Sequence, residues 1–536
     1  MIGRAGDESE SEESAAARQG RRGFLKASAA AAAGAGLFTV GSAAPSAAQE
    51  GGGDRPPKDT GRPGRRYLIR GGAVMSMDPD VGDFETADVL VEGKKIVDVR
   101  PGIRAAGADV IDARGRIVVP GFADTHHHQF ETALRGTLAD AVLFDDHSGS
   151  PSAVPNYADF VLTRMAPAYR PQDVYINVLF SGLTQLDAGI TTVHDTSQIH
   201  HSPEHSDASV QALVDSGRRS VLQYTAGDAR PESRFPEDAH RLRNRWFSSD
   251  DQLVGMAMGG EFYAGGEESW SRAWKIGRQL GLQITAHVVS GSGVGPVVDD
   301  FAKGTAGIDK DLGAGDDTLF IHMTGVSDMA WRRFRDAGVQ VSAAFPIEMA
   351  MRHGTPPILK MQELGMEPSL SSDVETTMAP DPFTLMRSAF TMQRMLVNQM
   401  ILEQGDFMPP DHWPTPAEGT PDLLTVRDVL RFATLNGAKH LRLDHKSGSL
   451  TPGKEADIVL LDATAPHVTP LNNVPGAVVS LMDRSNVETV IVAGKVRKWR
   501  GRLLDVDLHR LSGELEASRD HLFKTVGVKR DLFGSS

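Results

Sequence analysis

The middle of the chain, from about Pro120 to Ala438, repeats short apolar strands that are each followed by a helical pattern. Strands that alternate with helices indicate parallel βα units and an α/β fold. The first strand ends at His126, and seven others are expected at 191–194, 221–224, 253–258, 283–288, 319–323, 340–344 and 369–372. Eight such strands close naturally into a (β/α)8 barrel of the TIM type, whose catalytic groups lie at the carboxyl ends of the strands.

The two flanks of this region have a different texture. Segments rich in β-branched residues and separated by turn residues predict a small antiparallel β unit before the barrel, and the same texture returns after it. We therefore expect a small β-sandwich domain built from both termini, with parts at 67–119 and 439–505 around a barrel at 120–438. Residues 506–536 are expected to form a C-terminal helical segment.

The first 48 residues have the pattern of a targeting segment. Arg21-Arg22 precedes an Ala-rich apolar run at 27–40, and small residues suit cleavage after Ala48. This pattern is similar to a twin-arginine export signal, so we expect a periplasmic or extracellular protein with a flexible linker at 49–66. The apolar run is too short and too rich in Ala and Gly to form a stable membrane anchor.

Composition limits the partners and the ligands. A net charge of -14 argues against a general nucleic-acid binder and against an anionic membrane surface as partner. We expect a small-molecule substrate and a homo-oligomer. Because the chain contains no Cys, it has no disulfide, no thiolate nucleophile and no sulfur ligand, and any metal must be bound by His, Asp or Glu.

Ionisable residues stand at the ends of several expected strands. His126 and His128 are two residues apart after an apolar run, and alternate residues of a strand point to the same side, so both imidazoles can reach one metal ion. Three neighbouring histidines can also form a solvated polar cluster. His287 and His322 stand at the ends of the fifth and sixth strands and Asp373 follows the eighth, and such residues at the same ends of successive strands are difficult to explain as core packing.

Several motifs together resemble the signature of the amidohydrolase superfamily, in its cytosine deaminase and chlorohydrolase-like branch. They are Pro120–His128 followed by Leu134-Arg135-Gly136, Gly189–Val193, Ser202–His205 and Gly448–Asp457. The resemblance covers residues 67–504. It implies that His126, His128, His287 and Asp373 hold one divalent ion, and nitrogen and carboxylate ligands suit either Zn²⁺ or Fe²⁺.

The resemblance also implies the catalytic roles. A bound cation supplies hydroxide at ordinary pH, Asp373 takes the proton and returns it to the leaving group, and His322 hydrogen-bonds the attacked oxygen or the hydroxide. Gln129 and Glu375 are candidate substrate contacts. No Lys stands at 253–260, where binuclear relatives carry a metal-bridging carboxylated Lys, so we expect a single ion.

One position departs from the family pattern. Relatives that deaminate amidine-like rings usually place Glu three residues after the strand-five His, and this chain has Ser290 there. Ser290 is a candidate substrate contact, but it cannot act as a carboxylic acid, so we expect poor deamination of cytosine and guanine.

The leading interpretation is a metal-dependent hydrolase that cleaves a non-peptide C–N bond in a cyclic amide or aminated heterocycle. One alternative keeps the fold and metal but displaces a halide or an alkylamine. Another is an exported binding protein that has lost its chemistry.

Other polar residues are weaker candidates. The histidines after the second strand and their loop, 198–205, either line the substrate mouth or form a solvated loop, and Asp195 is a candidate for orienting a neighbouring ligand. These histidines are His194, His200, His201 and His205. Met349, Met351 and His353 are interpreted as packing residues.

Overall fold

The computed structural model of the chain describes residues 55–226, 233–263, 266–304, 313–404 and 416–533. The expected export signal, its cleavage site and the linker before residue 55 lie outside these residues. Among the described residues, no helix combines the length and apolar character that crossing a membrane requires.

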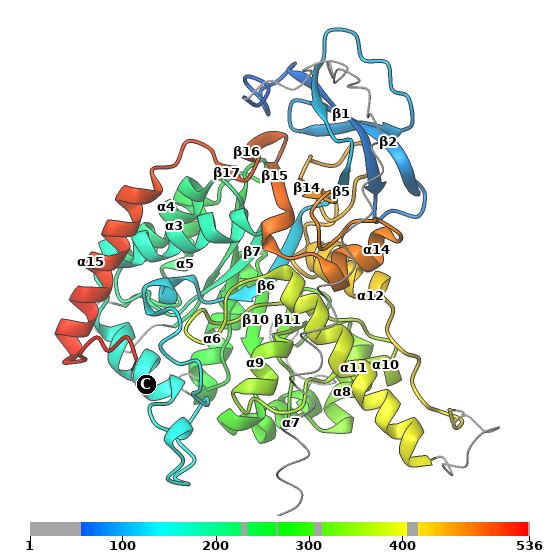
Figure 1. Cartoon of the computed structure of the whole chain (residues 1–536). Helices are drawn as coiled ribbons and strands as arrows, with labels where there is room; N and C mark the ends of the chain where they lie inside the picture. Colours follow the sequence, from blue (N-terminus) through cyan, green and yellow to red (C-terminus); the bar gives the residue numbers. More distant parts are fainter. Residues whose placement is uncertain (1–54, 227–232, 264–265, 305–312, 405–415, 534–536) are drawn as a thin grey trace, which may run out of the picture. The chain divides into compact units, whose positions relative to one another are not determined.

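Eight parallel strands form the central barrel (Figure 1). They lie in the sheet in chain order, and a parallel bridge between His127 and Asp373 joins the first strand to the end of the last. The strands are β6 (Phe122–His127), β7 (Ile190–Ser197), β8 (Arg219–Tyr224), β9 (Val254–Gly259), β10 (Gln283–His287), β11 (Thr318–Ile321), β12 (Gln340–Ala343) and β13 (Ser369–Leu370). The predicted (β/α)8 barrel is confirmed.

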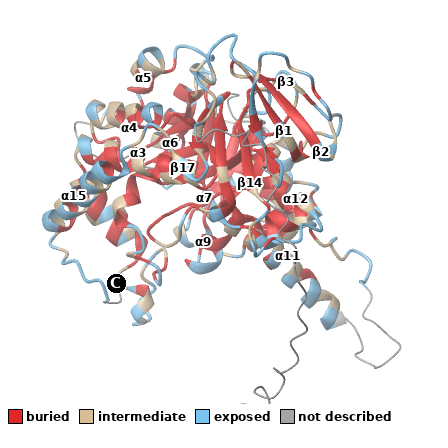
Figure 2. Cartoon of the chain, turned by 45° about the horizontal axis from the view of Figure 1, so that its top comes forward, coloured by how far each residue is buried: buried red, intermediate tan, exposed pale blue. Residues whose placement is uncertain are grey.

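The barrel strands are buried on both faces, as parallel strands covered by helices must be. Every residue of β6, β7, β8, β10 and β11 is buried, and Figure 2 shows buried strands surrounded by helices with exposed outer faces. The helices between and after the strands are α3 (Pro171–Asp187), α4 (Pro203–Ser216), α5 (Ala239–Trp246), α6 (Gly266–Gln279), α7 (Gly295–Gly304), α8 (Asp328–Ala337), α9 (Phe345–Ala350), α10 (Ile358–Glu363), α11 (Pro382–Gln404), α12 (Val426–Arg431) and α13 (Gly437–His440).

Helix α8 illustrates how local sequence sets these elements. The hydroxyl of Ser327 accepts a hydrogen bond from the backbone N–H of Ala330 and caps the first turn. Trp331 and Phe334 bury one face, and Gly338 ends the helix in the left-handed conformation that glycine adopts without steric cost.

A second sheet combines strands from both ends of the chain, in the order β17-β16-β15-β14-β5-β1-β2-β3, with β4 beside β1. Figure 1 shows β14 next to β5, and these two strands pair antiparallel. The strands are β1 (Arg66–Met75), β2 (Asp83–Glu92), β3 (Lys95–Arg100), β4 (Asp109–Asp112), β5 (Arg116–Pro120), β14 (Ile458–Asp462), β15 (Val487–Val492), β16 (Lys495–Trp499) and β17 (Arg502–Leu503). The expected domain assembled from both termini is therefore present.

The pairing inside this sheet corrects one expectation. We predicted antiparallel pairing throughout the N-terminal part, but β1 pairs in parallel with both β4 and β5. Strands joined by a tight turn, such as β2 and β3, must run antiparallel, whereas a strand that returns by a longer connection is free to pair in parallel. Short helix α14 (Val474–Gly476) follows β14, and α15 (Leu508–Val526) lies within residues 506–536, where a C-terminal helical segment is expected.

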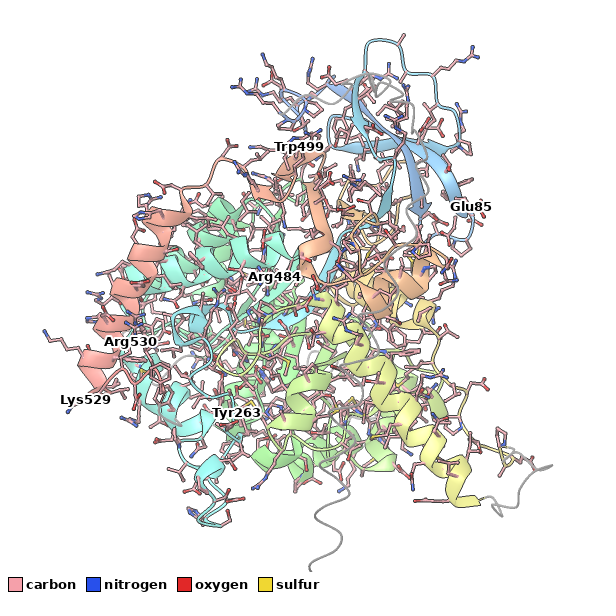
Figure 3. The ribbon with its side chains drawn as sticks, in the orientation of Figure 1. Glu85, Tyr263, Arg484, Trp499, Lys529 and Arg530 are labelled. Atoms are coloured by element: carbon pink, nitrogen blue, oxygen red, sulfur yellow. The ribbon has the colours of Figure 1, made fainter. Side chains whose placement is uncertain are left out.

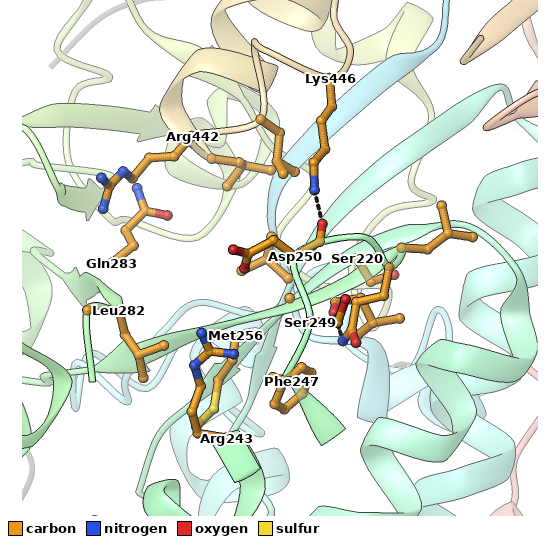
Figure 4. Close-up of a pocket in the computed structure, with 18 of the residues that line it drawn as sticks. Ser220, Arg243, Phe247, Ser249, Asp250, Met256, Leu282, Gln283, Arg442 and Lys446 are labelled. Atoms are coloured by element: carbon orange, nitrogen blue, oxygen red, sulfur yellow. Dashed lines mark hydrogen bonds between the residues drawn. The ribbon is translucent and has the colours of Figure 1, made fainter. Parts of the chain in front are cut away.

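The amino ends of the barrel strands are tied to the second sheet by buried ion pairs. Arg219 is the first residue of β8, and its Nε lies 2.8 Å from Oδ2 of Asp457. Its Nη2 lies 2.8 Å from Oε2 of Glu455. A cavity of about 370 Å³ lies at this same end, with the first residues of β9 and β10 in its wall (Figure 4).

Candidate metal centre and active site

The His-x-His pair enters the barrel interior at the carboxyl end of β6. The rings of His126 and His128 lie edge to face with centroids 4.7 Å apart. The hydroxyl of Thr196 on β7 donates to Oε1 of Gln223, so it accepts from Nδ1 of His126, at 2.7 Å. The Nδ1 of His128 donates to the carbonyl of Thr196 at 3.1 Å. Both imidazoles are thus held through Nδ1, and each Nε2 keeps a free lone pair.

The middle histidine of the triplet points the other way, as strand alternation requires. Nδ1 of His127 lies 2.9 Å from Oγ of Ser372, and its Nε2 lies 3.2 Å from Oε1 of Glu375. Ser181 of α3 also donates to Glu375, at 2.7 Å. His127 therefore belongs to the support behind the strand and leaves the metal positions to its two neighbours.

Closure of the barrel brings Asp373 to the histidines. The backbone N–H of Asp373 donates to the carbonyl of His126 at 3.0 Å, and the N–H of His128 donates to the carbonyl of Asp373 at 2.8 Å. Oδ1 of Asp373 then lies 3.0 Å from Nε2 of His126 and 3.5 Å from Nε2 of His128. Asp373 has a φ of 61°, a left-handed conformation that is uncommon for a residue with a side chain and that clusters at functional sites.

His287 at the end of β10 is oriented by a residue that the sequence analysis did not identify. Glu261 follows β9, and its Oε1 lies 2.9 Å from Nδ1 of His287 while its Oε2 accepts from the His287 backbone N–H at 2.8 Å. Burial lowers the pKa of His287, but the Glu261 carboxylate outweighs burial and the net shift is upward. An acidic residue just beyond the end of a barrel strand was the available signal for Glu261.

His322, after β11, is held in the same way by a second missed acid. Its Nδ1 lies 3.0 Å from Oε1 of Glu348 in α9, and its Nε2 lies 3.6 Å from Oδ2 of Asp373. Burial raises the pKa of Glu348 to about 8 and lowers that of His322 to about 4. His322 also has a left-handed backbone, with φ of 68°.

These side chains can hold a divalent metal ion. The candidate ligand atoms of His126, His128 and His287 lie within 4.8 Å of one another, as do those of His126, His322 and Asp373. Oδ2 of Asp373 is buried and has no hydrogen-bond partner among the described residues. Burial holds the pKa of His128 at about 3, so its imidazole is neutral, which is the form that binds a metal. Imidazole and carboxylate donors of this kind suit Zn²⁺.

A cavity of about 310 Å³ opens onto the cluster. His128, His287, His322 and Asp373 contribute to its wall, together with the rings of Tyr157 and Tyr263. Tyr263 is labelled in Figure 3 and accepts a hydrogen bond from Gln198 at 2.9 Å. The remaining wall is mostly apolar and consists of Leu143, Phe144, Leu162, Val289, Met351 and Val374, with Gln198, Ser292 and His353.

The three candidate substrate contacts from sequence do not line this cavity. Gln129 accepts a hydrogen bond from the buried Arg218, and Glu375 is bound by Arg135 as well as by His127. Ser290 is exposed, and its backbone N–H donates to Oγ1 of Thr324 at 3.0 Å. Their expected direct contact with substrate is therefore corrected: the first two support the barrel end from behind, because barrel closure turns their side chains away from the cavity.

The residues after the second strand are largely engaged with the protein itself. His200 hydrogen-bonds Ser206 at 2.9 Å, His201 donates to the carbonyl of Ala166 at 2.9 Å, and His205 donates to that of Tyr169 at 3.0 Å. Within the fully described loop 198–205, Gln198 lines the cavity.

Two other predicted positions lie inside β7 instead of following it. His194 is buried in the strand, and Asp195 is buried beside it, where burial raises its pKa to about 6.

The packing interpretation of the segment after β12 holds for Met351, which lies in the hydrophobic core, and is wrong for Met349, which is exposed. Met351 and His353 also line the cavity. Sequence could not separate these roles, because Arg352 and Gly354 both adopt positive φ, of 59° and 118°, and this bend sets which side chains enter the cavity.

Comparison with known proteins places the chain in a family. Residues 117–497 match the model of the amidohydrolase family. The 5'-deoxyadenosine deaminase of Methanosarcina mazei is 26% identical over 469 residues, which is 86% of this chain and 99% of the relative. The 5-methylthioadenosine/S-adenosylhomocysteine deaminase of Symbiobacterium thermophilum is 27% identical over 445 residues, or 80% of this chain and 93% of the relative.

Solved structures share the fold. A zinc-bound adenosine deaminase from Xanthomonas campestris superposes with a TM-score of 0.69 at 21% identity, covering 86% of this chain and 99% of that one. A zinc complex of atrazine chlorohydrolase from Arthrobacter aurescens gives 0.70 at 21% identity, covering 84% and 100%. The branch inferred from the motifs is confirmed, and the chain belongs to the amidohydrolase family as a metal-dependent hydrolase of carbon–nitrogen bonds other than peptide bonds.

Proposed function

We propose that the protein deaminates an aminated, purine-like heterocycle that carries a substituent of low polarity. The observation that carries the proposal is the cavity in which His128, His287, His322 and Asp373 face a largely apolar wall. The named deaminases that match most of the chain act on adenine nucleosides, which have an amino group on a purine ring. Small-molecule sites of this form use a few polar groups to orient a mostly apolar ligand.

The chain's own residues account for the proton transfers. When bound at the histidine cluster, a divalent ion lowers the pKa of water and supplies hydroxide near neutral pH. Asp373, with one oxygen unpartnered, accepts the water proton and passes it to the departing amine as oxygen adds to carbon and the C–N bond breaks. His322, fixed by Glu348, is placed to stabilise the charge on the attacked centre.

The wall of the cavity supports an apolar substituent on the ring. Leu143, Phe144 and Leu162 line one part of it, and Asp373 is the one carboxylate among the described residues that line it. A substrate with several charged groups would leave them desolvated there without partners. A 5'-deoxy or thioether-substituted nucleoside therefore fits this environment better than a nucleotide.

A second candidate is displacement of a halide or an alkylamine from an aminated heterocycle. Ser290 favours it, because a leaving group that departs without ring-nitrogen protonation does not need the absent carboxylic acid. The same feature predicts poor activity on cytosine and guanine.

We also propose that the metal is zinc and that each chain holds one ion, supported by the nitrogen and carboxylate donors and by the absence of Lys from β9. Stripping the protein with a chelator should abolish turnover, and titrating Zn²⁺ back should restore it fully at one ion per chain. Full activity that requires two ions per chain would contradict this stoichiometry.

The substrate proposal is tested with the zinc-loaded protein and a matched panel. Ammonia release is measured for 5'-deoxyadenosine, methylthioadenosine, adenosine, cytosine and guanine, and halide or amine release is measured for a chlorinated and an alkylamino-substituted triazine. The proposal expects ammonia release to be fastest from the nucleosides with apolar 5' substituents. Turnover confined to the triazines would establish the second candidate in its place.

We further propose that residues 1–48 direct export by the twin-arginine route. Arg21-Arg22, the apolar run at 27–40 and the small residues before Gln49 support this proposal. Replacing both arginines by lysine should retain the precursor in the cytoplasm, while the unaltered protein should be exported with a new N-terminus near Gln49. Normal export of the double variant would overturn the assignment.

A further inference from the structure

One histidine at the cavity has no task in the chemistry described above. His353 is 4% exposed, and neither of its ring nitrogens has a hydrogen-bond partner among the described residues. Its ring packs edge to face against that of His322, with centroids 4.7 Å apart. A buried imidazole without partners is costly unless a ligand or water completes its hydrogen bonds, and this imidazole lies in the cavity wall.

The backbone places His353 beside the position at which the family pattern has its acid. The N–H of Ser290 donates to Oγ1 of Thr324, and that hydroxyl donates in turn to the carbonyl of His353. A Cβ built on Gly354 would lie 3.4 Å from Cβ of Ser290. The segment carrying His353 is therefore packed directly against the residue that replaces the missing carboxylic acid.

Two other acids near the site do not line the cavity. Glu375 is bound by Arg135 and His127, behind the strand ends. Oε1 of Glu131 accepts a hydrogen bond of 2.5 Å from the hydroxyl of Tyr157, and Tyr157 lines the cavity whereas Glu131 does not. Neither carboxyl faces the substrate space, whereas the two unpartnered nitrogens of His353 belong to a side chain that lines it.

We propose that His353 binds the substrate by donating a hydrogen bond to a ring nitrogen of the heterocycle, in the place taken by the acid of other family members. The inference rests on the proposed function, because it names the group that recognises the purine-like ring. A neutral imidazole offers one N–H and one acceptor nitrogen, and both ring nitrogens of His353 are without a hydrogen-bond partner among the described residues. Such a donor orients and polarises the ring nitrogen without giving up its proton.

The bend that presents His353 is built into the chain. Arg352 and Gly354 flank it with φ of 59° and 118°, so the imidazole sits at a sharp turn after α9. A Cβ at Gly354 would also meet Cβ of Thr324 at 2.9 Å, which ties the turn closely to the strand-six side of the cavity. This geometry fixes the direction of the side chain before substrate arrives.

The test uses the zinc-loaded full chain with two replacements. His353→Leu removes the donor, and His353→Gln keeps a donor and an acceptor of similar reach. The kcat/KM for the best nucleoside should fall about 100-fold in His353→Leu and much less in His353→Gln. His509→Leu, on the exposed outer helix α15, is the matched control and should behave as the unaltered protein.

Binding without turnover separates this inference from the proposed reaction. Purine riboside lacks the amino group, and its 1-deaza analogue also lacks the ring nitrogen beside the reacting carbon. The unaltered protein should bind purine riboside about tenfold tighter than the analogue, and His353→Leu should bind both equally. Unchanged zinc content would show that the metal centre is intact.

Each outcome decides the matter. Equal binding of the two probes by the unaltered protein, retained discrimination in His353→Leu, or binding of neither probe would overturn the role of His353. Discrimination that depends on His353 in a protein that releases no ammonia from any nucleoside would support the recognition and overturn the proposed deamination.

Discussion

The two ends of the barrel bury ionisable groups in opposite ways. At the amino end, the guanidinium of Arg219 is paired with both Asp457 and Glu455, and a further oxygen contact to Asp457 at 3.2 Å uses the same Nη2. At the carboxyl end, His287 and His322 are each hydrogen-bonded through Nδ1 to the carboxyl group of a Glu, while Nε2 is left available. Complete pairing serves stability, and systematically incomplete pairing marks the chemical site.

The carboxyl end also holds backbone conformations that side chains disfavour. His322 and Asp373 both have positive φ, and both present their side chains to the shared centre. These two residues adopt an unfavourable backbone conformation, and that conformation directs their side chains to the shared centre. We therefore expect substitutions at the carboxyl end to lower the rate without unfolding the protein. Substitutions at the amino end should destabilise the fold without lowering the rate.

Asp373→Asn should produce the largest effect. The amide cannot carry a proton, so kcat should fall by about 10⁴-fold, near the upper end of what general acid–base catalysis contributes. The free energy of unfolding of the metal-free protein should change little, because Oδ2 of Asp373 makes no hydrogen bond among the described residues and the amide of Asn can keep the contact that Oδ1 makes with His126.

Steady-state kinetics after zinc loading, with metal content measured on the same sample, checks this prediction. A rate within about tenfold of that of the unaltered protein would show that another residue transfers the proton. The assignment of this chemistry to Asp373 would then be wrong.

Arg219→Met should produce the largest effect on stability. Removing the guanidinium leaves the buried carboxylate of Asp457 without its counter-charge and leaves Glu455 with only the more distant Lys94, at 3.6 Å, and breaking a buried pair typically costs about 3–5 kcal/mol. Both carboxylates belong to the segment before β14, so the contact between barrel and second sheet should loosen first. The folded, zinc-loaded variant should keep its kcat.

Urea unfolding measures the cost, and Arg219→Lys is the matched control, because it keeps the charge but loses the two-pronged contact. A loss of kcat in folded Arg219→Met, with unchanged unfolding free energy, would reverse the assignment of the two ends.

The strands of the barrel could be predicted from the sequence, whereas the loops at their carboxyl ends could not. The barrel strands were predictable because parallel strands buried on both faces are short apolar runs, and the period of a strand put His126 and His128 on one side with His127 on the other. Asp373 was assigned to the site by resemblance to the family, and closure of the barrel explains its proximity to β6.

The supporting carboxylates were not predictable from periodicity. Glu261 lies after β9 and Glu348 lies in α9, and their directions depend on how the chain leaves the strand ends. The prediction of the residues that line the substrate cavity failed for the same reason. Gln129 and Glu375 stand close to metal-site residues in sequence, but their side chains turn away from the cavity. His353 lines the cavity from a bend that no sequence pattern reveals. Loop conformation is set by non-periodic backbone angles, so neighbourhood in sequence is a poor guide there.

Glu261→Gln should sharpen the description of the carboxyl end. The amide keeps the size of the side chain but replaces the charged acceptor for Nδ1 of His287, so the imidazole loses basicity and orientation. Zinc affinity or kcat should fall about 10–100-fold, a typical effect of losing a group that orients a metal ligand. Competition with a zinc-binding dye measures the affinity, and an unchanged affinity together with an unchanged rate would mean that the contact is incidental.

The smallest effect is expected at the amino-end cavity of Figure 4, and it is the most direct test of the asymmetry. Arg442 and Ser220 line this cavity, and Lys446 donates to the backbone carbonyl of Asp250 there, so the cavity contains polar groups and enough space for a small molecule. The barrel places its chemistry at the opposite ends of the strands, and Arg442 is exposed. Arg442→Ala should therefore change kcat/KM by less than about twofold, the scale of an ordinary surface substitution. A loss of tenfold or more in kcat/KM in a folded, zinc-loaded Arg442→Ala variant would contradict this prediction. It would show that the amino end of the barrel influences the chemistry at the carboxyl end.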